Sequence, residues 1–220
     1  LIFFFLSSNF FTHYRKREKA SVQKEFAKGN VRDFWQVMAN GGVAALLAVV
    51  YSIYPQPVVF IAFLGVVGTV TADTWATELG VLSQRAWSVV SLKRGRVGTS
   101  GAVSLLGLAA SFAAGVGVAL FVFGLDWLST QYGLPLIGSA ERQFTGGWQW
   151  IFLIGVTSFF GSLADSVLGA RMQTMFYCEH CKKETERREH SCGRQTRWLR
   201  GFRWMDNDGV NFLSSLAGAL

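Results

Sequence analysis

Residues 101–125 read GAVSLLGLAASFAAGVGVALFVFGL and carry no charged side chain. A helix needs about 20 predominantly apolar residues to cross the hydrocarbon core of a bilayer. Further runs with few or no charges occupy residues 41–54, 58–68, 148–163 and 210–220. Together these runs exclude a soluble globular fold and predict an all-α, polytopic integral membrane protein.

The composition argues against nucleic-acid binding as the default function of this basic chain. The 220 residues carry a formal net charge of +7, yet half of them are hydrophobic, 16% are charged and the mean hydropathy is +0.29. Soluble basic proteins usually dilute their apolar residues with charge. We therefore expect membrane lipids, and no nucleic acid, as partners.

The apolar runs predict six helices, at residues 1–11, 37–54, 58–82, 101–125, 148–170 and 209–220. The first and the last are too short to span a bilayer, and we expect each to be part of a longer helix that is cut at the end of the chain. A cleaved signal peptide is the alternative for residues 1–11, although no small-residue cleavage site follows them. Residues 1–220 are expected to form a single transmembrane domain.

Basic residues gather in three of the segments that connect these helices. Twenty of the 21 Lys and Arg residues lie in 12–36, 83–100 and 171–208, which leaves only Arg142 for the connections on the opposite side. Because positive charge is retained on the cytoplasmic side of a membrane, we expect the three basic loops to be cytoplasmic, at the plasma membrane if the source is prokaryotic. Attraction to anionic lipid headgroups is the alternative explanation for any single cation.

Short motifs recur at the ends of the predicted helices. Met-x-Asn-x-Gly-Val occurs at 38–43 and again at 205–210, each time directly after a basic loop, and Ala-Asp-[Ser/Thr] with an upstream Gly occurs in 68–74 and 161–166. Two helices separate each copy from the next, so the copies run parallel and their motifs reach the same side of the membrane. The sequence therefore predicts three parallel hairpin repeats.

Two aspartates lie within predicted membrane helices. Asp73 precedes the end of its helix by about nine residues, or roughly 13 Å at about 1.5 Å per residue, and Asp165 occupies the corresponding place in the later copy. A charged residue at such a place costs about 2.5–3.5 kcal/mol and is usually functional. The structural alternative is that small neighbouring residues form packing seams and that a nearby hydroxyl satisfies each Asp.

Further carboxylates lie near the basic loops and join these two aspartates as candidate metal ligands. Such hard oxygen ligands, without a thiol or imidazole in the same helices, suit Mg²⁺. The candidate Mg²⁺ ligands are Asp73, Glu78, Asp165, Asp206 and Asp208.

A turn with glycines at both ends, Gly98-Thr99-Ser100-Gly101, follows Lys93, Arg94 and Arg96. We expect it to begin a helix whose free N–H groups bind phosphate. Together with Mg²⁺ it would form a polyphosphate site, although no P-loop motif occurs.

The sequence Cys178-x-x-Cys181 is followed by His190-x-Cys192, within the basic loop 171–208. Thiols stay reduced in the cytoplasm, and three thiolates with one imidazole form a closed tetrahedral zinc site. We expect a structural Zn²⁺ in residues 178–192 that braces the loop. Free thiols are the alternative, as is His180 in place of His190.

Four motifs in order resemble one protein family. They are TADTWATELG (71–80), GTSGAVS (98–104), GSxADS (161–166) and DNDxVNxxS (206–214). They are similar to the phytyl phosphate kinase family, which includes transmembrane protein 19, and 73–80 also fits the D-x-x-A-x-x-x-G pattern of CTP-dependent polyprenol and dolichol kinases. The resemblance runs from about residue 40 to the C-terminus and implies a multi-pass helical protein that phosphorylates an isoprenyl monophosphate.

This resemblance and the polar residues together suggest a membrane-embedded lipid kinase that uses Mg²⁺ and a nucleoside triphosphate, CTP or ATP, and acts on a prenyl phosphate lipid. The residues expected at the catalytic centre are Asp73, Asp165 and Asp208. Those expected to hold phosphate or metal are Asn40, Lys93, Arg94, Arg96, Thr99, Ser100, Asn207 and Asn211. A CTP-dependent cytidylyltransferase and an ion-coupled transporter are the alternative functions.

Overall fold

The computed structural model describes residues 1–23, 33–134 and 147–220. The described residues form seven helices, which are α1 (Ile2–His13), α2 (Lys16–Gln23), α3 (Phe34–Ile53), α4 (Pro57–Gly80), α5 (Leu105–Tyr132), α6 (Trp148–Met172) and α7 (Asn207–Ala217). Each of the six predicted helices corresponds to one of them, and α2 is additional. Arg142, the cation expected on the opposite side, lies outside the described residues.

Four of the described helices, α3, α4, α5 and α6, are long and apolar enough to cross a membrane. The other two predicted helices, α1 and α7, have 12 and 11 residues. This mostly helical architecture confirms the predicted class of polytopic membrane protein.

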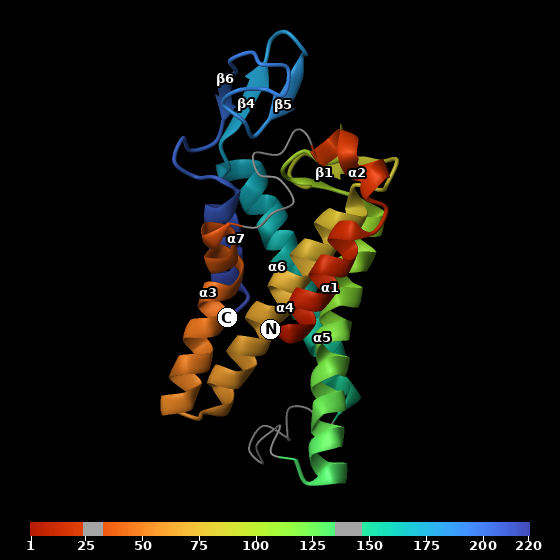
Figure 1. Ribbon diagram of the computed structural model, residues 1–220, viewed down its shortest axis with the longest axis vertical. Coiled ribbons are helices and arrows are strands. Elements are labelled where there is room, and N and C mark those ends of the chain that lie inside the picture. The colour runs from red at the N-terminus through yellow and green to blue at the C-terminus, as the bar shows by residue number, and fades with distance from the viewer. Residues whose placement is uncertain (24–32, 135–146) are drawn as a thin grey trace.

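The helices alternate in direction along the chain. Figure 1 shows that α1, α4 and α6 run toward the end that carries the strands, and that α3, α5 and α7 run away from it. All the Lys and Arg residues that the structure describes lie in the segments at or beyond this end, which we call the basic end. The arrangement agrees with hairpins whose motifs lie on one side, whereas a count of three repeats stays a prediction.

Side-chain caps fix where several helices begin. Asp33 caps α3 by accepting from Gln36 N at 2.9 Å, and Asp206 caps α7 by accepting from Gly209 N at 3.0 Å. Ser104 caps α5 in the same way through Gly107 N. The helix predicted from residue 101 therefore begins four residues later, and it extends past residue 125 to end at the left-handed Gly133.

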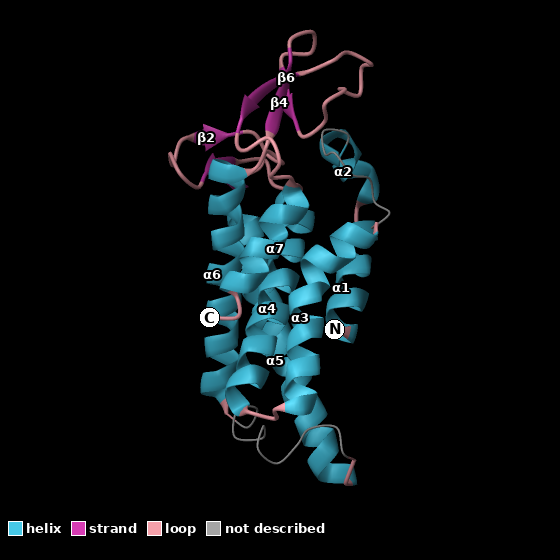
Figure 2. Ribbon diagram, turned by 90° about the vertical axis from the view of Figure 1, so that its left-hand side faces the viewer, coloured by secondary structure: helices cyan, strands magenta, loops and turns pink. Residues whose placement is uncertain are grey.

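Two small antiparallel sheets correct the purely helical prediction. The first consists of β1 (Ala86–Ser88), β2 (Arg94–Gly95) and β3 (Ala102–Val103) in the order β2-β1-β3, and the second of β4 (Met175–Cys178), β5 (Lys183–Thr185) and β6 (Arg197–Arg200) in the order β5-β4-β6. Both lie at the basic end, beyond the helices (Figure 2). The sequence predicts only loops in these connections, because strands of two to four residues leave little alternation to detect.

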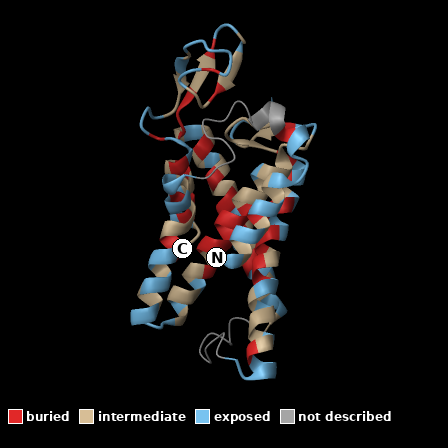
Figure 3. Ribbon diagram, viewed as in Figure 1, coloured by how far each residue is buried: buried red, intermediate tan, exposed pale blue. Residues whose placement is uncertain are grey.

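Helix α4 lies at the centre of the bundle, packed against α1, α3, α5, α6 and α7. Buried residues concentrate in this central part (Figure 3). The approach of α4 to α6 depends on glycine, since a Cβ at Gly161 would overlap the side chain of Thr69 and one at Gly68 would overlap Ser158. These contacts confirm that small residues near the two aspartates allow the helices to pack closely.

Candidate functional site

A cavity of about 320 Å³ lies at the basic end of the bundle. Side chains from α1, α3, α4, α5, α6 and α7 line it, together with residues 97–104. Ten of the predicted site residues reach its wall although they lie far apart in sequence. They are Asn40, Asp73, Glu78, Thr99, Ser100, Asp165, Asp206, Asn207, Asp208 and Asn211.

The carboxyl groups of Asp73 on α4 and Asp165 on α6 meet inside this cavity in hydrogen-bonding contact. Asp165 Oδ2 also accepts a hydrogen bond from Ser214 Oγ of α7 at 2.6 Å, so a neighbouring hydroxyl does satisfy one of these oxygens. Two carboxylates in contact repel each other unless a proton or a cation lies between them. The pair therefore favours either a shared proton or a bound cation.

Amides surround this pair. Asn211 Nδ2 donates to Asn40 Oδ1 at 3.4 Å, which connects α7 to α3. When the Asn211 amide is turned over, its nitrogen instead donates at 3.3 Å to both Asp165 Oδ2 and the backbone oxygen of Asn207. The first orientation joins Asn211 to Asn40 of one Met-x-Asn-x-Gly-Val motif, and the second joins it to Asn207 of the other and to Asp165.

Two other acidic residues of the cavity, Asp206 and Glu78, have structural partners of their own. Asp206 uses Oδ1 to cap α7. Glu78 accepts from Thr12 Oγ1 at 2.9 Å and from the Nζ of Lys19, a lysine with 0% exposure. Among the described residues, no three cavity carboxylates form a ready-made group of metal ligands. The five predicted Mg²⁺ ligands thus share a cavity without converging on one point.

Two expectations about phosphate binding need correction. Lys93, Arg94 and Arg96 are exposed on the β1–β2 hairpin and its flank and do not line the cavity, so their placement does not support direct phosphate contact there. The turn 98–101 lines the cavity but does not begin a helix, because β3 and Ser104 separate it from α5.

Three residues in or next to the cavity, Lys19, Gln173 and Glu186, were not predicted from the sequence. Lys19 counted as one loop cation among seven, with no signal that it is buried. Gln173 and Glu186 also line the cavity, where Gln173 Nε2 donates to Glu186 Oε1 at 2.8 Å and Gln173 Oε1 accepts from Ser100 Oγ at 2.6 Å. For Gln173, the position directly after a membrane helix was the sequence feature that could have indicated its place at the cavity.

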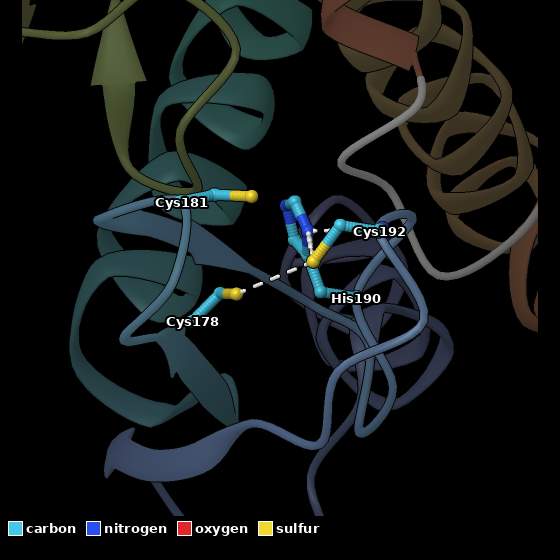
Figure 4. Close-up of side chains that lie close together, drawn as sticks. All are labelled: Cys178, Cys181, His190 and Cys192. Carbon is cyan, nitrogen blue, oxygen red and sulfur yellow. Dashed lines mark hydrogen bonds between the residues drawn. The ribbon is translucent and has the colours of Figure 1, made fainter.

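Cys178, Cys181, His190 and Cys192 form a compact cluster beside the second sheet, with all four ligand atoms within 4.8 Å of one another (Figure 4). Cys178 ends β4, and Cys181 lies in the turn to β5, where Lys182 adopts a φ of 52°. The sulfurs of Cys178 and Cys192 are 3.8 Å apart, close to the edge of a tetrahedron with Zn–S bonds of about 2.3 Å. The donor set is that of a closed metal site, with His190 rather than His180 as its imidazole.

Hydrogen bonds already polarise these thiols. Hydrogen bonds with the His190 ring and with the backbone of Arg194 lower the pKa of Cys192 to about 6. Cys181 donates to Cys192, which raises the pKa of the Cys181 thiol to about 11. The lowered pKa favours the thiolate form of Cys192, which is the form that binds a metal ion.

Comparison with known proteins agrees with this architecture. Residues 1–219 match the family described as integral membrane protein DUF92. Protein PGR of Arabidopsis thaliana is 32% identical over 233 residues, a match that covers 98% of this chain and 76% of that protein. No solved structure matches significantly. These findings confirm the resemblance that the four motifs indicated, and the chain belongs to the DUF92 family of integral membrane proteins.

Proposed function

We propose that the protein is a membrane-embedded lipid kinase that transfers a phosphoryl group from CTP or ATP to an isoprenyl monophosphate. The observation that carries this proposal is the convergence of ten polar residues, Asn40 and nine from the four motifs, on one cavity at the basic end. The sheets and loops around the cavity would face the cytoplasm, where nucleotide is available.

The charge of the cavity explains why such a reaction would depend on a divalent cation. Six carboxylates line it, those of Asp73, Glu78, Asp165, Glu186, Asp206 and Asp208, and none of the described lining residues is Lys or Arg. A polyphosphate would be repelled from this wall unless metal ions neutralised it. Asp73, Asp165 and Asp208 fit the hard-oxygen chemistry of Mg²⁺, which would neutralise charge that develops on the phosphoryl oxygens.

The residues of the chain would act by positioning rather than by covalent chemistry. An oxygen of the prenyl monophosphate forms a bond to the γ-phosphorus, the bond from that phosphorus to the β-γ bridging oxygen breaks, and the nucleoside diphosphate leaves. The attacking oxygen is already ionised at neutral pH, so no strong general base is needed. Asn40, Asn207 and Asn211 would orient phosphate oxygens, as would Thr99 and Ser100.

The cysteine cluster would hold a structural Zn²⁺. Three thiolates and one imidazole fill a tetrahedral shell, which leaves no position for substrate. The metal would therefore stabilise the loop 171–208 and take no part in phosphoryl transfer.

Turnover of a prenyl monophosphate with γ-labelled nucleotide tests the proposal in purified, lipid-reconstituted protein. We expect label in the prenyl diphosphate, and a loss of about 10³-fold in rate for Asp73→Asn and Asp165→Asn, because each removes a charge that would hold the metal. Asp126→Asn is the matched control, since Asp126 is also in a membrane helix but lies away from the cavity. Full activity in both active-centre variants would remove the site.

Other products would identify the alternative functions. Release of pyrophosphate in place of a nucleoside diphosphate would indicate a cytidylyltransferase. Nucleotide-independent uptake into liposomes, driven by a proton or sodium gradient, would indicate a transporter.

A further inference from the structure

Residues 173–205, which we call the cysteine insert, have almost no apolar core. Met175, Cys178 and Met205 are the buried apolar residues among them, and neither hydrophobic cluster of the bundle includes a residue of the insert. A segment of this size cannot be stabilised by so little apolar burial. Metal binding at the cluster would supply the missing free energy, as it does in small metal-dependent domains.

The insert nevertheless reaches the cavity through side chains at two of its strands. Glu186, one residue after β5, accepts from Gln173, and Gln173 in turn accepts from Ser100 on the turn 98–101. Gln173 is 2% exposed, so this chain of hydrogen bonds is shielded from water. Shielding makes each bond more costly to lose.

A second connection runs from β6 to the same turn. Arg200 Nη2 donates to Ser100 O at 3.1 Å, and Nη1 donates to Ala170 O at 2.5 Å near the end of α6. The turn is pressed against α6 at this point, because a Cβ at Gly101 would overlap Ala170. Both the side chain and the backbone of Ser100 are thus held by groups that the insert helps to fix.

The base of the insert also holds a second part of the cavity wall. Thr174 N donates to Met205 O at 2.7 Å, and Met205 directly precedes the residues at the start of α7 that line the cavity. The insert therefore fastens two walls of the cavity that are about 100 residues apart in sequence.

We propose that metal bound at the cysteine cluster orders the cavity through Glu186, Gln173 and Arg200, which act as positioning residues for Ser100 and its turn. The proposal rests on the proposed function only in taking the cavity as the nucleotide site. Metal occupancy would then set the geometry of the phosphate-binding turn, in addition to the stability of the insert itself.

Hydrogen–deuterium exchange on the full chain in lipid nanodiscs tests this proposal without any turnover. Zinc-loaded protein is compared with protein treated with a zinc chelator. We expect the chelator to accelerate exchange about tenfold or more in 98–104 as well as in 173–205, while α4 and α5 keep their protection. Acceleration confined to 173–205 would overturn the coupling, as would acceleration across the whole bundle, which would make the metal a global stabiliser.

Gln173→Leu separates the coupling from the metal site. The substitution keeps a similar volume but removes both hydrogen bonds, so exchange in 98–104 should be fast even with zinc bound, and the zinc content should stay the same. Gln195→Leu is the matched control, because Gln195 is an exposed glutamine in the same insert. Equal exchange in the two variants would contradict the role of Gln173.

If the kinase reaction is detected, a second measurement distinguishes positioning from general stability. Gln173→Leu should raise KM for the nucleotide about tenfold, the equivalent of about 1.4 kcal/mol, with kcat changed by less than about threefold and the melting temperature unchanged. A lower melting temperature with unaltered KM would overturn the positioning role. Absence of any kinase activity would leave the exchange result standing, so the two proposals fail separately.

Discussion

The cysteine cluster and the cavity are both polar sites at the basic end, but they are assembled in opposite ways. The four cluster ligands lie within residues 178–192, beside one small sheet that has little apolar support. The cavity draws its wall from six helices, between Thr12 and Asn211, and depends on close helix packing. The comparison indicates that a metal ion would hold the first site together, whereas buried contacts between distant helices hold the second.

The largest expected effect concerns the cluster. Cys178→Ser should abolish zinc binding and unfold the insert, because apparent zinc-binding free energies of about 10–16 kcal/mol are also folding free energy in such sites. The helices should persist, since their packing does not involve the cluster. Zinc content by atomic emission and limited proteolysis of the insert provide the measurement.

The two histidines offer a matched pair for the same test. His190→Ala should lose zinc, and His180→Ala should retain it, because the structure places the His190 ring with the three cysteines. Zinc loss in His180→Ala alone would reverse this ligand assignment. One zinc per chain in Cys178→Ser would show that the cluster is not the metal site.

The next largest loss of stability is expected on breaking the buried ion pair between Lys19 and Glu78. This change tests whether the pair holds the wall of the cavity. Lys19 Nζ also donates to Phe11 O and Thr12 O at the end of α1, so the lysine fastens α1 and α2 to α4. Lys19→Met should cost about 3–5 kcal/mol, as expected when one partner of a buried pair is removed. Thermal unfolding in detergent measures this loss.

An exposed pair nearby is the control. Arg15 and Glu18 have half-exposed side chains, so Arg15→Met should cost at most about 1 kcal/mol. Adding Glu78→Gln to Lys19→Met should recover part of the lost stability, because it removes the uncompensated charge. Equal effects of Lys19→Met and Arg15→Met would mean that the ion pair does not hold the cavity wall.

The contrast between a cluster formed within one short segment and a cavity formed by distant helices also explains what the sequence could predict. The apolar runs predicted six helices, and each corresponds to a helix of the structure, since span length and hydropathy are local properties. The spacing of cysteines and histidine indicated the cluster for the same reason. Asp73 and Asp165 were recognised as a pair because a carboxylate in a membrane helix is costly and rare.

Features that depend on tertiary packing could not be predicted. Lys19 is indistinguishable from its basic neighbours until α2 folds back onto α4. Lys93, Arg94 and Arg96 adjoin a cavity-lining turn in sequence, yet the β1–β2 hairpin directs that segment into solvent. Gln173 gains its partners only when the turn 98–101 and the insert meet at the end of α6.

The smallest expected effect concerns the seam between α4 and α6. Gly161→Ala should destabilise the bundle by about 1–3 kcal/mol, because its methyl group would overlap Thr69 in a tightly packed region. Gly124→Ala is the matched control, since a Cβ there meets nothing within 4 Å. Thr69→Ala combined with Gly161→Ala should recover part of the loss in melting temperature by making room for the methyl group. If Gly161→Ala melted like Gly124→Ala, the cavity would not depend on this close approach, and the contrast with the cysteine cluster would lose its basis.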